Sequence, residues 1–394
     1  MRAGVGKVTG IIEIQVENRK RREKAKLKPG DFWIMIFTVM LVIFGLIMVF
    51  SASYYYSISK FGNAYSYLLR HGMWVLLGFV AMVFGAVFDY RYYKKIALPA
   101  AIVSVILLAL LLTPLGETRN GATRWLSLGP ITVMPGELAK LAVILFVAWF
   151  LSSDTDRIRS IVKGVLPLLG VAVIYGGLII MQPNLSTAIT VCGIIIAMML
   201  VAGLKWRYVI ATGCLGASGI MFIVLFMKNS YWYSRLTSFM DPFQDSLGDG
   251  YQAVQSLLAL GSGGLFGVGL GKSVQKNLYL PEPQNDFILA IIGEELGLIG
   301  VLALIALYCL FIWRGTHIAI NAPDQFGMLL ASGIVLMVAI QVILNIAVVT
   351  SSMPATGINL PFISYGGNAL LIFMFCAGVL INISRHEASN TGVN

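Results

Sequence analysis

Long apolar stretches alternate with short polar segments along almost the whole chain of 394 residues. About 20 consecutive apolar residues are needed for a helix to cross the hydrocarbon core of a bilayer. The pattern therefore predicts an all-α, polytopic membrane protein with about ten transmembrane helices. We place these helices at residues 32–54, 71–89, 96–114, 135–152, 165–182, 186–203, 208–227, 286–312, 327–350 and 368–384.

One polar insert, residues 228–286, interrupts this pattern. Polar and irregular backbone at a membrane is tolerated only where protein or a water-filled cavity surrounds it. The insert contains a glycine-rich run and ends in YLPEPQNDFILAIIGEELG, which brings a carboxylate to the start of an apolar helix. We therefore expect the functional site to involve this insert.

The distribution of Lys and Arg predicts the orientation of the chain, because cytoplasmic loops carry the excess of basic residues. With the N-terminus inside, 19 of the 28 basic residues fall on the inner side. The chain then divides into a basic cytoplasmic tail (1–30), a ten-helix membrane domain (31–384) with a large extracytoplasmic loop (228–286), and a cytoplasmic C-terminal tail (385–394). The tail sequence RKRREKAKLK serves as a topology anchor or binds a partner or anionic lipid, and no signal-peptide cleavage site follows it.

Composition excludes several classes of protein. Hydrophobic residues make up 58% of the chain and charged residues 12%, whereas a soluble domain carries roughly twice that charged fraction. The four cysteines lie inside apolar stretches without CxxC spacing, so they predict neither a disulfide framework nor a zinc site. The three histidines are scattered, and no GxxxxGK[ST] motif for nucleotide binding is present. If the protein carries out a process that needs energy, the energy must therefore come from a substrate or an ion gradient.

Ionisable residues cluster between the third and fourth predicted helices, in GATRWLSLGPITVMPGELAK. This segment contains Arg124, and then Glu137 and Lys140 three residues apart on one helix face. Charged groups at membrane depth are costly and usually face a cavity or pair with one another. Glu137 and Lys140 are therefore either a structural ion pair or a pair that faces a substrate. The later segment MQPNLSTA predicts a helix break at Pro183.

The polar insert offers further candidates, among them Arg235, Lys276, Glu282 and the triplet Asp241, Asp245 and Asp249. Its GVGLG run lacks the preceding strand that a dinucleotide-binding site requires, and the Asp and Gly residues lack calcium-loop spacing. Glycine here is better explained by a tight re-entrant loop whose backbone approaches a ligand or other helices.

Asp286 immediately precedes the apolar run FILAII, and we therefore expect it near an outer helix N-terminus. Two interpretations are open. Asp is a favoured N-cap residue, and a carboxylate in a cavity can also act as a general base when neighbouring groups shift its pKa. Glu294 and Glu295 lie two turns deeper in the same helix.

Five segments together resemble a known family. They are RWLSLGPITVMPGELAK, QPNLSTA, GYQAVQSLLALGSGGLFGVGLGKSVQK, YLPEPQNDFILAIIGEELG and PATGINLPFISYGGNAL. In this order, across almost the whole chain, they are similar to the SEDS proteins (shape, elongation, division and sporulation). The GVGLGKSVQKNLYLPEP stretch is closer to the FtsW/SpoVE branch than to RodA. The resemblance implies a multi-pass protein of the bacterial cytoplasmic membrane that joins lipid II into peptidoglycan glycan strands outside the membrane.

The resemblance also implies roles for individual residues. Asp286 is the essential acidic residue, which we take as the general base. The substrate-binding positions that the resemblance implies are Arg124, Glu137, Lys140, Arg235, Lys276 and Glu282. We expect the basic members of this set, with or without a bridging metal, to offset charge on the departing diphosphate. Four positions depart from the family pattern, namely Gly136, Asn184, Gln284 and Asn368.

The resemblance further implies the ligands and partners. They are lipid II, the growing glycan strand, a class B penicillin-binding protein with transpeptidase activity and other division proteins, with no nucleic acid. No cofactor is certain; a divalent cation, magnesium or manganese, is compatible with the chemistry, but no ligand set is recognisable in the sequence. The competing hypotheses are a precursor flippase or ion-coupled carrier that uses Glu137, Lys140, Glu294 and Glu295 as a relay, and a non-catalytic scaffold for a transpeptidase.

Overall fold

The computed structural model describes residues 29–119, 122–128, 131–154, 156–208, 210, 211, 213, 239–244, 246, 248 and 250–386. Among them, eight helices are long and apolar enough to cross a membrane. They are α2 (Phe32–Phe61), α3 (Ser66–Val87), α4 (Arg91–Leu110), α5 (Pro135–Ser152), the span Ile161–Ile180 that contains α6 (Leu166–Ile180), α11 (Ile288–Ile320), α12 (Gln325–Val349) and α13 (Gly367–Arg385). A shorter apolar helix, α7 (Leu185–Val201), follows α6. Nine of the ten predicted spans thus correspond to helices, and the predicted span 208–227 lies almost wholly outside the described residues.

Local sequence signals explain where several helices begin and end. The carboxylate of Asp31 accepts a hydrogen bond from the Ile34 N–H (2.9 Å) at the start of α2, and Gly62 ends this helix with a φ of 68°. Asp324 caps α12 in the same way through the Gly327 N–H (2.8 Å). Helix α5 begins with Pro135, at a position where the missing N–H would have no helical partner. A 3₁₀ turn (Arg157–Arg159) and a π-helical turn (Ile161–Val165) lead into α6.

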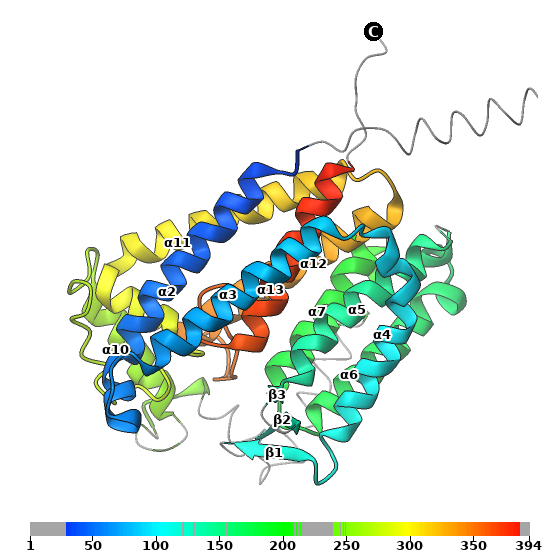
Figure 1. The fold of residues 1–394 in the computed structure, drawn as a ribbon. Coiled ribbons are helices and arrows are strands. Elements are labelled where there is room, and N and C mark those ends of the chain that lie inside the picture. Colours follow the sequence, from blue (N-terminus) through cyan, green and yellow to red (C-terminus); the bar gives the residue numbers. More distant parts are fainter. Residues whose placement is uncertain are drawn as a thin grey trace, which may run out of the picture.

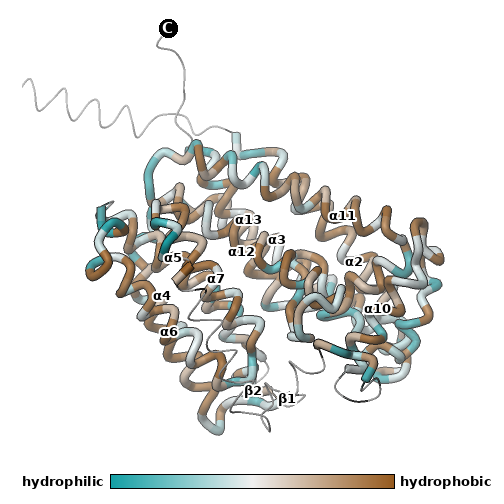
Figure 2. Tube along the Cα trace, turned by 180° about the vertical axis from the view of Figure 1, so that it is seen from behind, coloured by the Kyte–Doolittle hydropathy of each residue, from teal (hydrophilic) through white to brown (hydrophobic). Residues whose placement is uncertain are grey.

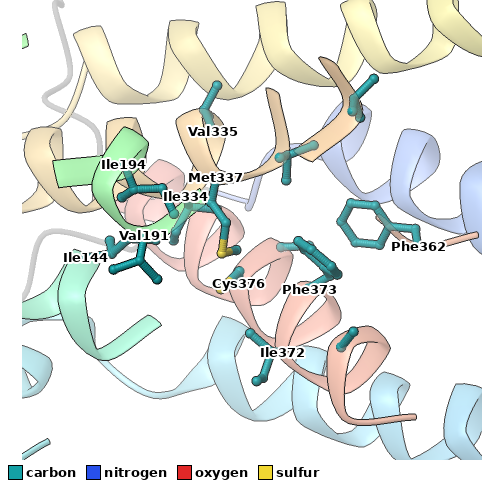
Figure 3. Close-up of a cluster of buried hydrophobic side chains, with 14 of the residues drawn as sticks. Ile144, Val191, Ile194, Ile334, Val335, Met337, Phe362, Ile372, Phe373 and Cys376 are labelled. Carbon is teal, nitrogen blue, oxygen red and sulfur yellow. The ribbon is translucent and has the colours of Figure 1, made fainter. Parts of the chain in front are cut away.

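The centre of the molecule is an apolar core between α5, α7, α12 and α13. Figure 3 shows side chains of these helices meeting, with Ile144 from α5 beside Val191 and Ile194 from α7 and Ile334 from α12. The outward faces of α3, α4 and α6 carry exposed Leu, Ile, Val and Phe side chains, and the brown colour in Figure 2 runs along these helices. A continuous apolar outer surface is expected where lipid replaces water as the solvent.

A small antiparallel sheet is present in addition to the predicted helices. Strands β1 (Gly116–Arg119), β2 (Ala122–Leu128) and β3 (Ile131–Val133) pair in the order β1-β2-β3. The sheet and helix α10 (Tyr251–Gly263) lie at the end of the bundle opposite to the start of α2 and the end of α13 (Figure 1). These two helix ends contact each other, because the Asp31 N–H donates to the Ser384 Oγ (2.8 Å). The described chain therefore enters and leaves the bundle at the same end.

Helix α11 is broken at Gly297, where φ is 68° and ψ is −170°. The break frees backbone groups that the glycine-rich loop satisfies. The N–H groups of Val268 and Gly269 donate to the carbonyls of Glu294 (2.9 Å) and Glu295 (3.0 Å), and the Leu298 N–H donates to the carbonyl of residue 264 (2.9 Å). A Cβ at Gly297 would collide with the backbone of this loop. The predicted close approach of the glycine-rich run to another helix is thus observed.

Candidate active site

Asp286 lies just before α11, as predicted, but it does not cap this helix. The helix begins at Ile288, and its N-cap residue is Phe287, which makes no side-chain hydrogen bond to the first turn. The N-cap interpretation of Asp286 is therefore wrong. The carboxylate remains available for another role, and the side chain is only partly exposed.

Arg124, from strand β2, comes close to the Asp286 carboxylate at Gly357, in the segment between α12 and α13. A Cβ placed on Gly357 would lie 2.7 Å from the Asp286 Oδ2 and 3.0 Å from the Arg124 Nη1. Both charged groups thus pack against the same glycine, and a side chain there would displace them. The Arg124 Nη2 also donates to the carbonyl of Pro183 (3.0 Å), in the turn between α6 and α7. Segments far apart in sequence therefore converge on one carboxylate.

The surroundings of Asp286 shift its acidity toward neutral pH. Burial raises its pKa from 3.8 to about 6; the positive charge of Arg124 acts against this shift, and the negative charge of Glu282 adds to it. Glu282, in the turn before Asp286, accepts a hydrogen bond from the Asn285 Nδ2 (2.8 Å). A carboxylate with a pKa near the working pH is suited to general-base catalysis, because it is deprotonated yet still basic.

Buried polar side chains that the sequence analysis did not single out hold this arrangement together. Asn345, on α12, donates from its Nδ2 to the carbonyls of Asp286 (2.9 Å) and Ile358 (2.7 Å). The Ser186 Oγ, on α7, donates to the carbonyl of Gly357 (3.0 Å). The available sequence signal for Asn345 is an amide within an apolar span, since polar residues in such spans often mark functional positions.

Glu137 and Lys140 form a buried ion pair on α5. The Lys140 Nζ lies 2.6 Å from the Glu137 Oε2, and the residues are 3% and 5% exposed, respectively. The same Nζ donates to the Gln341 Oε1 on α12 (3.2 Å). Asn345 follows Gln341 by one helical turn, so both amides occupy the same face of α12. The pair on α5 thus contacts α12, the helix whose Asn345 binds the backbone of Asp286. Its predicted contact with substrate stays a prediction.

Lys276 and the two deeper glutamates attach the glycine-rich loop to the helices. The Lys276 Nζ lies 2.7 Å from the Glu295 Oε1 and donates to the Ser51 Oγ on α2 (3.0 Å). Glu294 accepts hydrogen bonds from the Ser273 hydroxyl and the Val274 N–H (2.8 Å). These contacts give both glutamates structural partners, so the geometry does not favour the relay that a carrier would need.

The remaining predicted positions divide between described and undescribed parts of the chain. Arg235, Asp245 and Asp249 lie outside the described residues, whereas Asp241 lies exposed in the insert. Within the described residues, no three His, Cys, Asp or Glu side chains come together as a metal site. Asp286 and Glu282 are the two carboxylates that affect each other here. The described side chains therefore provide no ready-made ligand set for a divalent cation.

The four positions that depart from the family pattern have structural contacts. Asn184 caps α7, accepting from the Thr187 N–H (3.4 Å), and a Cβ on Gly136 would lie 3.2 Å from the Thr187 Cγ2. The carbonyl of Gln284 accepts from the Tyr365 N–H (2.9 Å). The Asn368 Nδ2 donates to the carbonyl of residue 132 (3.1 Å), which joins α13 to β3. Gly136, Gln284 and Asn368 thus lie where separate elements meet, and Asn184 begins α7.

Comparison with known proteins identifies the family. The family model of FtsW, RodA and SpoVE, described as a cell cycle protein, matches residues 32–389. The chain belongs to the SEDS family. It is accordingly a multi-pass protein of the cytoplasmic membrane, as the sequence predicted.

Relatives and solved structures cover nearly the same length. Stage V sporulation protein E of Bacillus subtilis is 42% identical over 92% of this chain and 99% of its own. A probable peptidoglycan glycosyltransferase FtsW of Geobacter sp. is 38% identical over 91% of this chain and 98% of its own. The fold matches a chain from a peptidoglycan synthase complex that coordinates polymerization and crosslinking (TM-score 0.75, 27% identity, 92% of this chain and 99% of that chain). It also matches the rod shape determining protein RodA of Thermus thermophilus (TM-score 0.67, 27% identity, 92% and 98%).

Proposed function

We propose that this protein is a peptidoglycan glycosyltransferase that polymerises lipid II at the outer face of the cytoplasmic membrane, in cell division or sporulation. The observation that carries the proposal is the Asp286 carboxylate held beside Arg124 at Gly357. The curated relatives support it, since FtsW proteins 38% identical to this chain are named as probable peptidoglycan glycosyltransferases.

The site contains what the reaction needs. Asp286 takes the proton from the 4-hydroxyl of the acceptor sugar as that oxygen attacks the anomeric carbon of the donor. The bond from this carbon to the lipid diphosphate breaks, and the diphosphate leaves with the electron pair. Arg124 is placed to offset the negative charge that develops on it. Among the candidate diphosphate contacts that the structure describes, Arg124 is the one beside Asp286, while Lys140 and Lys276 already pair with carboxylates.

We also propose that the protein works with a class B penicillin-binding protein, which would crosslink the strands that it polymerises. The support is the fold match to a chain of a peptidoglycan synthase complex that coordinates polymerization and crosslinking.

Asp286→Asn tests the proposed role of the carboxylate. Asn keeps the size of the side chain and removes its basicity, so the protein should fold normally while lipid II polymerisation falls by roughly 10²–10⁴-fold, as is typical for loss of a general base. The measurement is the rate of glycan formation from labelled lipid II by purified protein without added energy. Asp156→Asn, at an exposed position between α5 and α6, is the matched control and should keep wild-type activity.

Two results would contradict the proposal. Near-wild-type polymerisation by folded Asp286→Asn protein would remove the general-base assignment. Movement of lipid II across the membrane without polymer formation would instead show a carrier, and neither activity would show a scaffold.

A further inference from the structure

Asn345 is a fully buried amide within the apolar helix α12, at 0% exposure. Its Nδ2 donates both of its hydrogens to backbone carbonyls, those of Asp286 (2.9 Å) and Ile358 (2.7 Å). These carbonyls belong to two separate segments, the start of α11 and the chain between α12 and α13. A single planar amide thus joins the peptide of the proposed base to the segment that carries Gly357.

The Ile358 carbonyl follows directly after the Gly357 carbonyl, which accepts from the Ser186 Oγ on α7 (3.0 Å). Gly357 itself packs against both the Asp286 Oδ2 and the Arg124 Nη1. The segment is therefore held from both sides, by α7 through Ser186 and by α12 through Asn345. The N-cap residue Phe287 makes no side-chain hydrogen bond to the first turn of α11, so the bond from Asn345 is a side-chain attachment of the backbone at the start of this helix.

We propose that Asn345 is a positioning residue that fixes the Asp286 carboxylate relative to Arg124 and Gly357. This inference rests on the proposed general-base role of Asp286. Asn345 acts through the backbone of the base and does not touch the reacting atoms. A displacement of about 1 Å in such a group can lower a rate by about 10²-fold, so loss of the amide should act on the chemical step rather than on binding.

Helix α12 is a rigid support for this role. It packs against α5, α7, α11 and α13, and one turn before Asn345 its Gln341 accepts from the Lys140 Nζ (3.2 Å). The same face of α12 therefore joins the Glu137–Lys140 ion pair and the peptide of Asp286. Because α12 is held at both contacts, Asn345 can hold the backbone of Asp286, and with it the carboxylate, in one position.

The test compares Asn345→Ala with Asn382→Ala in the full-length protein. Asn382, on α13, is also buried, at 2% exposure; its Nδ2 donates to the Ala86 carbonyl (2.9 Å), and its Oδ1 accepts from the Tyr90 N–H (3.0 Å). Both substitutions remove two buried amide hydrogen bonds, so both should lower the melting temperature. At a temperature where both variants are folded, Asn345→Ala should lower kcat for lipid II polymerisation by about 10–100-fold. Its KM should stay within about twofold of wild type, and Asn382→Ala should keep the wild-type kcat.

A second readout does not depend on activity. A hydrophobic carbodiimide labels protonated carboxyl groups, so mass spectrometry of Asp286 at a series of pH values reports the midpoint of its titration. The charged groups that act on this carboxylate are Arg124 and Glu282. If Asn345→Ala lets the carboxylate move away from Arg124, the midpoint should rise, because the attraction to the positive charge weakens with distance. Asn382→Ala should leave it unchanged.

The outcomes separate the two proposals. An Asn345→Ala protein with the kcat and the labelling midpoint of Asn382→Ala overturns the positioning role. If Asn345→Ala does not fold, Asn345→Ser, whose hydroxyl can keep one of the hydrogen bonds, takes its place. If neither folds while Asn382→Ala does, Asn345 is architectural and the positioning role is overturned. Failure of the wild-type protein to polymerise lipid II overturns the proposed function, and the labelling midpoints still decide the role of Asn345.

Discussion

Asp286 shows how opposing effects set the chemistry of one residue. Burial favours its neutral form strongly enough to raise the pKa to about 6, even though Arg124 favours the charged form. Arg124 therefore keeps the carboxylate from remaining protonated at neutral pH, and burial keeps it basic. A more exposed Asp would be ionised but a weak base, whereas the same buried carboxyl without a cation would hold its proton more tightly.

The raised pKa predicts how activity depends on pH. The general base must be deprotonated, so kcat/KM for polymerisation should rise with pH through a midpoint near 6 and reach a plateau above it. The measurement is the initial rate at subsaturating lipid II between pH 5 and 8, with thermal unfolding at each pH as a control for stability. If kcat/KM instead falls only below about pH 4, near the ordinary pKa of an aspartate, a different group limits the rate.

The same shift has a consequence for stability. The native state binds this proton more tightly than the unfolded chain, whose carboxyl has a pKa near 3.8. The contribution of Asp286 to stability is therefore present below pH 4 and is lost as the pH rises through about 6. At neutral pH the carboxylate costs stability, as is common for groups whose pKa is shifted for function.

At the scale of elements, the break in α11 and the glycine-rich loop form one unit. The loop supplies hydrogen-bond partners for the backbone groups freed at Gly297. Its Lys276 side chain binds Glu295 on α11 and Ser51 on α2, which attaches the loop to both helices. Broken helices of this kind are tolerated at membrane depth where protein satisfies the freed backbone groups. The loop leads directly into the turn that carries Glu282 and Asp286, so its attachment fixes where α11 begins.

Lys276→Met should therefore destabilise the protein. Glu295 is 0% exposed, and removing one partner of a buried ion pair costs roughly 3–5 kcal/mol because the other charge is left unpaired. The double variant Lys276→Met with Glu295→Gln should recover most of the loss in thermal unfolding and should polymerise lipid II. The control is Lys272→Met, at an exposed position of the same loop, which should change neither property. A double variant that folds well but is inactive would instead support Lys276 as a substrate contact.

At the scale of the whole molecule, the site lies toward one end of the bundle. The sheet, α10 and the turn before α11 are at the end opposite to the first residue of α2 and the last of α13 (Figure 1). This polarity agrees with the proposed reaction, since a lipid-linked substrate is reached where the hydrocarbon meets water. Which end faces the outside is a prediction from the basic residues.

Cysteine labelling in intact cells checks this orientation. In a background in which Cys192, Cys214, Cys309 and Cys376 are replaced by Ala, a membrane-impermeant maleimide should label Gly248→Cys. It should spare Ser160→Cys until the membrane is permeabilised, because residue 160 lies in a loop predicted to be cytoplasmic. Labelling in the reverse order would overturn the outward-facing assignment of the insert.

The sequence by itself determined the helices, because about 20 apolar residues in a row have few alternatives to a membrane span. The described helices accordingly overlap the predicted ones, although some ends differ, as in α11, which ends at Ile320 rather than at residue 312. Sequence motifs also located Asp286, Arg124 and the Glu137–Lys140 pair, the last from a spacing that places two side chains on one helix face. The sheet was not predicted, since three short strands leave little periodicity in a polar segment.

Only the tertiary structure decided which of the candidates act together. Arg124 reaches Asp286 across more than 160 residues of sequence, whereas Lys276, ten residues from Asp286, turns to Glu295 and Ser51. Gly357 and Asn345 carry no charge that would mark them, and their roles come from a close approach and two hydrogen bonds between separate segments. Hydrophobic pattern is a property of neighbouring residues and can be read along the chain, while the acidity and position of a carboxylate depend on groups that only folding brings to it.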